Sequence, residues 1–476
     1  MRMTSRRQFL SAATAFAATG GYMPSLWAAM KYDRKGVLDL FHLRAEDTEE
    51  RVKAGVEENR KGPMLFTFKD KDGKILENVH VKVTQKTHDF RYGANLFMLD
   101  EFKEPERNAG YKDYFASAFN IATLPFYWSD LEPERGRPRF AKDSRKIYRR
   151  PPPDLCLEFC EKRGIEPKAH ILNYSPIPDW ARGDVGKEKR LLAERMRVLG
   201  ERYATRIPMW EVTNETLWGP ESRWTNFYQQ PDYIDWSFKT AEKYFPGNRL
   251  IINESHRRLW CDPWFSRTRS PYYMQIENAI AKGARIDGVG LQFHMFFKQE
   301  ESVRETRNFY DPQRIFDVMD TYAQLGRKLQ ITELTIPAYS YDPGDEEVQA
   351  EILRTLYRIW FSHPAMEAII YWNLVDGYAA FAPLGDMTAG ENYYHGGLIR
   401  HDFTPKPAYR VIQDLFQKEW RTAFTRDVGG RFAFRGFKGE YELEATANGK
   451  TVKKSFHISP DLSNSIEITV AQEEKT

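Results

Sequence analysis

Cysteine is scarce in this chain of 476 residues, which has three in total. Cys156 and Cys160 lie four residues apart in a helical pattern, a poor geometry for a disulfide, and Cys261 stands alone. No histidine or second cysteine pair accompanies them at a spacing typical of a metal site. The sequence therefore predicts no required disulfide, no bound metal and no cofactor.

The chain also lacks a strong charge of either sign and a long apolar run. Its net charge is +3, with basic and acidic residues interspersed, so nucleic acid is not an expected partner. No stretch after the N-terminal region is apolar enough for a transmembrane helix, so stable membrane insertion is not expected. Aromatic residues, by contrast, are abundant: 12 Trp, 25 Tyr and 31 Phe can fill a core or form platforms for sugar rings. The oligomeric state is not predicted.

The first 29 residues carry a targeting pattern. Arg6 and Arg7 precede a mildly apolar, Ala-rich run at residues 11–21. Two fixed charges before a hydrophobic segment too short to span a membrane resemble a twin-arginine export signal. We therefore expect cleavage near residues 28–29 and a periplasmic or secreted mature protein.

The hydrophobic pattern divides the rest of the chain into three parts. Residues 30–88 include short alternating strands and predict a small N-terminal β module. Residues 89–420 alternate strand-like runs with amphipathic helices, the rhythm of a parallel α/β sheet. Residues 421–476 return to short strands and predict a C-terminal module of the β-sandwich type.

Eight strand candidates in the central part predict a (β/α)8 TIM barrel. They are residues 90–97, 119–124, 167–172, 209–215, 250–254, 288–294, 329–334 and 368–374. Helices are expected between them, for example at residues 233–244, 272–282, 313–325 and 348–362. In such a barrel the C-terminal ends of all strands converge on one site. The residues at these ends are therefore the candidates for chemistry.

Two glutamates lie at predicted strand ends. Glu215 closes the fourth strand, and Glu333 lies near the end of the seventh. A pair of carboxylates flanking a bond is the minimum equipment for cleaving a glycosidic linkage. Glu215 is the candidate general acid/base, which requires a pKa raised by burial or by a neighbouring carboxylate, and Glu333 is the candidate nucleophile. Glu254, at the end of the fifth strand, is the competing candidate.

Other side chains at strand ends are expected to surround this pair. Asn214 adjoins Glu215 and is expected to hydrogen-bond a hydroxyl beside the reacting carbon. Gln292 and His294 alternate along the sixth strand and therefore share a face, where His294 is expected to orient Glu333. Four further candidates for substrate binding or orientation are His170, Trp372, Trp128 and Tyr174. Trp372 is expected to form an apolar floor beneath the sugar ring.

These segments resemble glycoside hydrolase family 10, the endo-β-1,4-xylanases of clan A. Residues 210–215, Trp-Glu-Val-Thr-Asn-Glu, are similar to its acid/base segment. Residues 331–335, Ile-Thr-Glu-Leu-Thr, are similar to its nucleophile segment, usually Ile-Thr-Glu-Leu-Asp. Residues 288–294 match its Gln-x-His strand, and residues 131–136 match its loop after the second strand. The resemblance implies retaining hydrolysis of a polysaccharide by double displacement, with the two carboxyls about 5–5.5 Å apart.

The sugar-binding rim departs from that family. The family usually has Asn-Glu-x-x-Lys-Trp after the second strand, which binds sugar hydroxyls, whereas residues 124–128 here read Leu-Pro-Phe-Tyr-Trp. The usual His-x-Leu-x-Trp-His is replaced by His-Ile-Leu-Asn-Tyr-Ser at residues 170–175, and a Trp-rich loop by residues 376–381. Loss of a hydrogen-bonding pair for a hydroxyl can change specificity by orders of magnitude. The alternatives are therefore hydrolysis of a glucan, galactan or decorated xylan, with endo or exo action open, and a barrel that binds carbohydrate without turnover.

Overall fold

The computed structural model describes residues 34–174, 176–217, 225–255, 258–261, 267–459 and 464–470. The expected targeting segment, residues 1–29, lies outside these ranges. Within them, no helix is long and apolar enough to cross a membrane. The described chain begins with a 3-10 helix (Arg34–Leu38), followed by α2 (Asp39–Leu43) and α3 (Ala45–Arg60).

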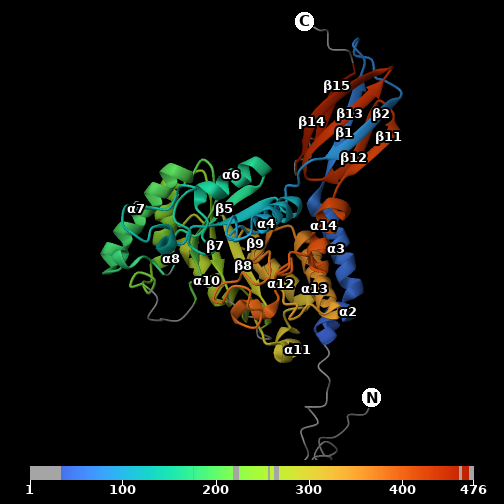
Figure 1. Ribbon diagram of the computed structural model, residues 1–476. Helices are drawn as coiled ribbons and strands as arrows, with labels where there is room; N and C mark the ends of the chain where they lie inside the picture. The colour runs from blue at the N-terminus through green and yellow to red at the C-terminus, as the bar shows by residue number, and fades with distance from the viewer. Residues whose placement is uncertain are drawn as a thin grey trace, which may run out of the picture.

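In the described ranges, eight parallel strands close into a barrel in the order β10-β3-β4-β5-β6-β7-β8-β9 (Figure 1). They are β3 (Arg91–Asn95), β4 (Ile121–Pro125), β5 (Glu166–His170), β6 (Met209–Asn214), β7 (Arg249–Glu254), β8 (Gly288–His294), β9 (Lys328–Thr335) and β10 (Met366–Tyr371). Each overlaps one predicted strand, so the predicted (β/α)8 barrel is confirmed. β4 and β6 are buried at every position, and β4 accordingly reads as an apolar run broken only by Thr123.

Helices connect these strands around the barrel. They are α4 (Pro105–Ala118), α5 (Trp128–Leu131), α6 (Pro153–Arg163), α7 (Val185–Tyr203), α8 (Tyr233–Tyr244), α9 (Arg258–Cys261), α10 (Pro271–Ala281), α11 (Ser302–Thr306), α12 (Pro312–Ala323), α13 (Pro343–Ser362) and α14 (Pro407–Asp414), with 3-10 turns at Asp179–Ala181, Arg267–Arg269, Gln299–Glu301 and Gly390–Tyr394 and a π-helical turn at Leu415–Glu419. Proline opens α6, α10, α12, α13 and α14, at a position where its missing N–H has no intrahelical partner to lose. Cys156 and Cys160 are free, buried thiols on α6.

The two predicted β modules form a single module in the structure. Its two sheets have the orders β12-β1-β15 and β11-β2-β13-β14, so strands from both ends of the chain share both sheets. The strands are β1 (Lys61–Lys69), β2 (Val79–Gln85), β11 (Ala423–Val428), β12 (Arg431–Phe437), β13 (Gly439–Ala447), β14 (Lys450–Ile458) and β15 (Ser465–Thr469). Alternate side chains such as Phe66, Val81 and Leu443 fill the core between the sheets. The expectation of separate N- and C-terminal modules is therefore wrong.

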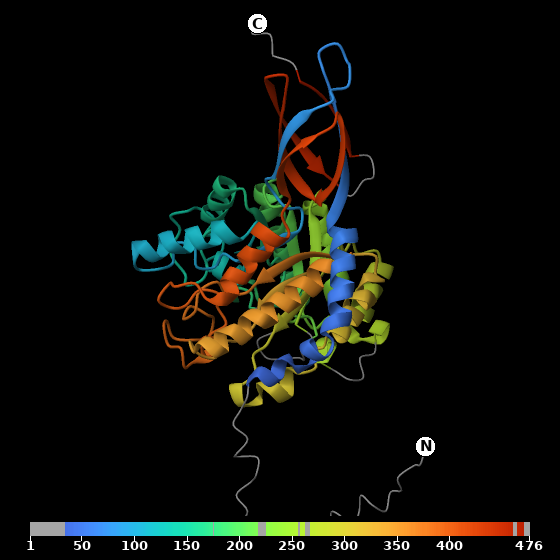
Figure 2. The same cartoon turned by 90° about the vertical axis from the view of Figure 1, so that its right-hand side faces the viewer.

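This two-sheet module joins the barrel at the end where the barrel strands begin. There α3 runs beside α13 (Figure 2), and Arg60, the last residue of α3, donates to the carbonyls of Phe361, His363 and Met366. These carbonyls include orphan acceptors at the C-terminal end of α13, where a positive charge is also favourable. The Arg60 guanidinium lies 4.8 Å from the ring centre of Phe90, directly before β3. The module therefore lies away from the strand ends that carry the candidate chemistry.

Candidate active site

Glu333 lies near the end of β9, where three side chains hold its carboxylate. The amides of Asn253 and Gln292 donate to its Oε1 at 2.8 and 3.0 Å, and Nε2 of His294 lies 3.2 Å from its Oε2. The side chain is only 4% exposed. Hydrogen-bond donors directed at a carboxylate favour its ionised form, which is the form that a nucleophile needs.

Glu215 follows β6 directly and has a φ of 51°, in the left-handed region. Its N–H donates to the carbonyl of Asn253 at 3.1 Å, and its own carbonyl accepts from the Tyr228 hydroxyl at 2.7 Å. The hydroxyl of Tyr174 donates to Oε2 of Glu215. Burial and then the charge of Glu215 raise the pKa of Tyr174, so its phenol remains a donor. The structure thus places Tyr174 as a partner that orients Glu215.

Gln292 joins the two glutamates. Its Nε2 lies 3.3 Å from Oε1 of Glu215 and 3.0 Å from Oε1 of Glu333, which puts these two oxygens at most about 6 Å apart. Carboxyl separations of about 5–5.5 Å are typical of retaining glycosidases, and about 6.5–9.5 Å of inverting ones. The predicted pair therefore converges at one point, within reach of a single glycosidic bond.

His294 lies beside Glu333 with its side chain 15% exposed, and it is uncharged at neutral pH. Burial lowers its pKa to about 4, against the attraction of Glu391 and Glu215. Its Nδ1 lies 2.9 Å from the hydroxyl of Thr335, which can donate to it, so Nε2–H is the group that faces Glu333. Neutral His294 therefore acts on Glu333 as a hydrogen-bond donor and not as a cation.

Asn214 and Trp372 complete this part of the site. Oδ1 of Asn214 accepts from the amides of Asn253 and Gln292 at 2.9 and 3.1 Å. Its amide nitrogen is then the donor that it can offer to a sugar hydroxyl. The Trp372 indole follows β10, is 8% exposed, and meets the ring of His294 edge-on at 5.9 Å. Its position beside the carboxylates suits the predicted apolar floor.

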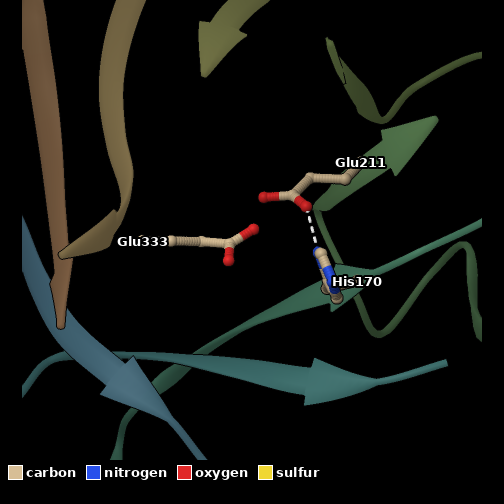
Figure 3. A group of neighbouring side chains, drawn as sticks. All are labelled: His170, Glu211 and Glu333. Carbon is tan, nitrogen blue, oxygen red and sulfur yellow. Dashed lines mark hydrogen bonds and ion pairs between the residues drawn. The ribbon is translucent and has the colours of Figure 1, made fainter. Parts of the chain in front are cut away.

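His170, at the end of β5, reaches the same centre from another side of the barrel (Figure 3). Its Nδ1 bonds to Glu211, and its Nε2 lies 2.9 Å from the hydroxyl of Tyr127. Lys168 forms a buried ion pair with Glu211. Although burial acts in the opposite direction, Lys168 and His170 lower the pKa of Glu211 to about 2. Lys168, Glu211 and His170 therefore form a buried, hydrogen-bonded group inside the barrel, next to Glu333.

Ligand atoms of His170, Glu211 and Glu333 lie within 4.8 Å of one another, a spacing that suits a metal ion. Both ring nitrogens of His170 already have protein partners, and Lys168 neutralises Glu211. These donors are thus engaged by the protein itself, and the chemistry proposed below needs no metal.

Glu211 and Asn253 are site residues to which the sequence reasoning gave no role. Glu211 lies within β6, and its carboxylate lies beside His170 and near Glu333 inside the barrel (Figure 3). Lys168 and His170 are two residues apart on β5 and therefore share a face. A charged residue within an apolar strand was the signal that could have identified Glu211.

Trp128 is not brought to this centre. Its indole is 4% exposed, meets the ring of Trp180 edge-on at 5.7 Å, and lies under the guanidinium of Arg195 from α7 at 5.4 Å. Its Nε1 donates to Glu132 at 3.3 Å. Within the described ranges, none of these contacts reaches another predicted site residue, so the structure gives no support to contact between Trp128 and a substrate.

The two glutamates influence each other electrostatically. Burial raises the pKa of Glu333 to about 8; the charge of Glu215 adds to this effect, while His170 and the Asn253 amide oppose it. In the protein without a substrate, these surroundings therefore favour a proton on Glu333.

The part of the chain that carries both glutamates matches a known protein family. The model of "Glycosyl hydrolase family 10" matches residues 101–415, about two thirds of the chain. The chain belongs to glycosyl hydrolase family 10.

Curated relatives in family 10 are distant. Endo-1,4-beta-xylanase 2 of Arabidopsis thaliana is 24% identical over 405 residues, which cover 82% of this chain and 33% of that protein. Endo-1,4-beta-xylanase B of Thermotoga neapolitana is 24% identical over 342 residues, which cover 69% of this chain and 88% of that protein. The chain spans between a third and a half of the length of the first curated relatives it matches.

Solved family 10 structures share the barrel. Xylanase 10B from Thermotoga maritima aligns with a TM-score of 0.54 at 22% identity, over 70% of this chain and 96% of that chain. Xylanase 10B from Thermotoga petrophila, solved in complex with xylobiose, aligns with the same TM-score and identity over 70% of this chain and 95% of that chain. These likenesses establish the fold.

Tyr127 stands where the family 10 rim segment usually carries its lysine. Its hydroxyl bonds to His170, and the guanidinium of Arg150 lies 3.8 Å from its ring centre. A cation over an aromatic face is a favourable contact. Arg150 also forms an ion pair with Asp130 at 2.8 Å, so this contact places a paired cation over Tyr127.

Glu254, the competing candidate for a catalytic role, has a structural role in this family 10 protein. Its carboxylate accepts from the N–H groups of Thr216 and Leu217, at 2.7 and 3.1 Å, directly after Glu215. It also accepts from the N–H of Ser255 at 2.8 Å. Burial raises its pKa to about 7, with the charge of Glu215 contributing. Glu254 is therefore placed to position the backbone that presents Glu215.

We predict that Glu254→Gln lowers kcat by about tenfold with little change in KM, because misplacing a reacting group reduces rate more than binding. Initial rates on a soluble polysaccharide substrate would measure both constants. Glu347→Gln, on the exposed side of α13, is the matched control. A loss as large as that expected for Glu333→Gln would instead make Glu254 a catalytic group.

Proposed function

We propose that this family 10 protein is a retaining glycoside hydrolase that cleaves a β-linked polysaccharide, with an endo-1,4-β-xylanase-like activity as the leading assignment. The observation that carries the proposal is the pair Glu215 and Glu333, bridged by Gln292 and at most about 6 Å apart. A protein that only binds carbohydrate has no use for two converging carboxylates.

The roles of the two glutamates follow from their surroundings. Glu333 is the proposed nucleophile because donors from Asn253, Gln292 and His294 stabilise negative charge on it. Glu215 is the proposed acid/base because it is more exposed, and a leaving group and water must both reach it. The first step needs an ionised Glu333 and a proton on Glu215, so the proton that burial favours on Glu333 has to move to Glu215 when the substrate binds.

The reaction proceeds in two displacements. An oxygen of Glu333 bonds to the anomeric carbon while the glycosidic bond breaks, and Glu215 transfers its proton to the departing oxygen. Glu215, now a carboxylate, removes a proton from water, whose oxygen attacks the same carbon and releases Glu333. The Asn214 amide is placed to hydrogen-bond a hydroxyl next to the reacting carbon as charge develops.

The substrate assignment rests on the relatives, which are named endo-1,4-beta-xylanases, and on the neighbour solved with xylobiose. One observation favours a second candidate. Tyr127 replaces the rim lysine, so a decorated xylan, glucan or galactan is the alternative substrate for the same catalytic pair.

A panel of purified xylans, glucans and galactans would test the substrate, with reducing ends and product sizes as readouts. We expect xylan to yield short oligosaccharides, and Glu333→Gln to yield none. Release from glucan or galactan alone would replace the substrate class but keep the mechanism. Binding to xylan without release from any polymer would favour the non-catalytic carbohydrate-binding barrel.

Export is a separate proposal and rests on the Arg6-Arg7 pattern, which lies outside the described residues. Replacement of both arginines with lysine should retain the protein in the cytoplasm of an expressing bacterium. Unchanged export of that variant would contradict a twin-arginine route.

A further inference from the structure

Three polar side chains near the catalytic pair have no part in the mechanism above: Arg149, Asn373 and Glu391. Arg149 lies in the loop between β4 and α6, Asn373 directly follows Trp372, and Glu391 lies in the 3-10 turn Gly390–Tyr394. They are a cation, an amide and an acid. This is the same set of groups that the rim segment of the family offers in Asn-Glu-x-x-Lys.

Each of the three keeps a buried polar atom without a hydrogen-bond partner. These atoms are Nε of Arg149, Oδ1 of Asn373 and Oε2 of Glu391. Arg149 and Asn373 are 3% and 8% exposed. Buried polar atoms without partners are rare in folded proteins, and a cluster of them calls for a specific explanation. A ligand that supplies the missing hydrogen bonds is such an explanation.

Ring contacts connect Arg149 to the catalytic centre. Its guanidinium lies 5.5 Å from the ring centre of Phe97, which meets Trp372 edge-on at 5.4 Å. Trp372 in turn contacts His294, the partner of Glu333. The Phe97 ring also lies under Arg150, which covers Tyr127 at the former lysine position. Arg149 therefore lies on the side of the site that Trp372 and Tyr127 border.

The surrounding loops hold the cation and the acid in place. Arg149 adopts a φ of 60°, and its Nη1 donates to the carbonyl of Tyr378. Next to Glu391, Asn392 accepts from the N–H of Ala379 at 2.9 Å and donates to the carbonyl of Pro383 at 3.1 Å. Burial raises the pKa of Glu391, whereas Arg149, His294 and the Asn373 amide lower it. Because Tyr378 and Ala379 are consecutive, the hydrogen bonds above bring the segments that carry Arg149 and Glu391 together.

We propose that Arg149, Asn373 and Glu391 form a hydroxyl-binding group for a sugar unit on the non-reducing side of the scissile bond, and that they determine specificity there. The inference rests on the proposed hydrolase function. The three residues supply, from the loops after β4 and β10, the chemistry that the usual rim segment no longer provides.

Hydroxyl groups fit this set better than charged substituents do. A hydroxyl both donates and accepts, so it can donate to Glu391 or Asn373 and accept from Arg149. A carboxylate on the sugar would meet Glu391 and the catalytic pair, and like charges repel. A cationic substituent would meet Arg149. A neutral, hydroxyl-bearing sugar unit is therefore the expected ligand, and the proposed function makes it xylose.

The test compares 4-nitrophenyl β-xylobioside with analogues in which one hydroxyl of the terminal xylose is replaced by hydrogen. We expect the parent enzyme to lose about 10- to 100-fold in kcat/KM on at least one analogue, the size of a hydrogen bond to a charged group. In Glu391→Gln, kcat/KM for the complete sugar should fall by about tenfold and the discrimination should shrink. Arg149→Met should act similarly, and Glu347→Gln, on exposed α13, should behave as the parent does.

Thermal unfolding of each variant would show whether it is folded. If Arg149→Met does not fold, the result for Glu391→Gln alone tests the inference. If the parent cleaves the xylobioside but Glu391→Gln retains both its kcat/KM and its discrimination, the inference is wrong and the proposed function stands. If the parent neither binds nor cleaves the xylobioside, the xylanase-like assignment fails, and this inference about a xylose unit fails with it.

Discussion

Replacing Glu333 with glutamine is expected to lower kcat by more than about four orders of magnitude while the protein remains folded. Loss of a nucleophile removes the covalent route entirely, and effects of this size are usual for such groups. The amide keeps the size of the carboxyl, so contacts with Asn253 and Gln292 can persist in part. Initial rates on xylan and circular dichroism would measure activity and fold together.

Labelling with a mechanism-based inhibitor tests the role of Glu333 as nucleophile independently of rates. A 2-deoxy-2-fluoro xylobioside with a good leaving group should form a stable ester with Glu333, located by peptide mass spectrometry. No label should form in Glu333→Gln, and Glu347→Gln should be labelled as the parent is. Labelling of Glu254 in the parent would move the nucleophile to β7 and overturn the assignment.

Glu333→Gln should also change how stability depends on pH. Burial raises the pKa of Glu333 from 4.5 to about 8, so the folded protein holds this proton more tightly than the unfolded chain does. The parent's free energy of unfolding should therefore fall as pH rises from about 5 to about 8. The variant lacks this titration, so its melting temperature relative to the parent should rise over that interval. A constant difference would contradict the raised pKa.

The barrel and the centre of its site were predictable because burial leaves a local signal. Strands such as β4 and β6 are buried on both faces and therefore read as mainly apolar segments. Glu215 and Glu333 stand out at the ends of such runs, and period-two alternation placed Gln292 with His294. The convergence of these residues follows from barrel closure, which brings all strand ends to one face.

What the sequence missed depends on contacts between distant segments. β1 pairs with β12 and β15, and nothing local in these strands indicates pairing between opposite ends of the chain. The Trp128 indole follows a barrel strand, but the chain turns into α5 there, and the ring packs against Trp180 and Arg195. Arg149 and Glu391 lie in connecting segments that have no hydrophobic periodicity. The sequence there predicts neither whether a side chain is buried nor which way it points.

Glu215→Ala should show the second large effect, and its size should depend on the leaving group. On xylan, kcat/KM is expected to fall by about three orders of magnitude, the usual contribution of general acid catalysis. On 4-nitrophenyl β-xylobioside the first step should be much less affected, because nitrophenolate departs without protonation. Without a base to activate water, the glycosyl-enzyme should then accumulate, and the release of nitrophenol should show a burst.

Azide distinguishes the two glutamates in a way that rates alone do not. In Glu215→Ala, azide fits the space of the lost carboxyl and attacks the glycosyl-enzyme without needing a base, so it should restore turnover and yield a β-glycosyl azide. In Glu333→Ala, azide would instead attack the substrate directly from the opposite face and yield the α-product, because a single displacement inverts configuration. Proton NMR of the anomeric signal would identify each product. The absence of rescue in Glu215→Ala, or rescue with inversion, would contradict its role as the acid/base of a retaining mechanism.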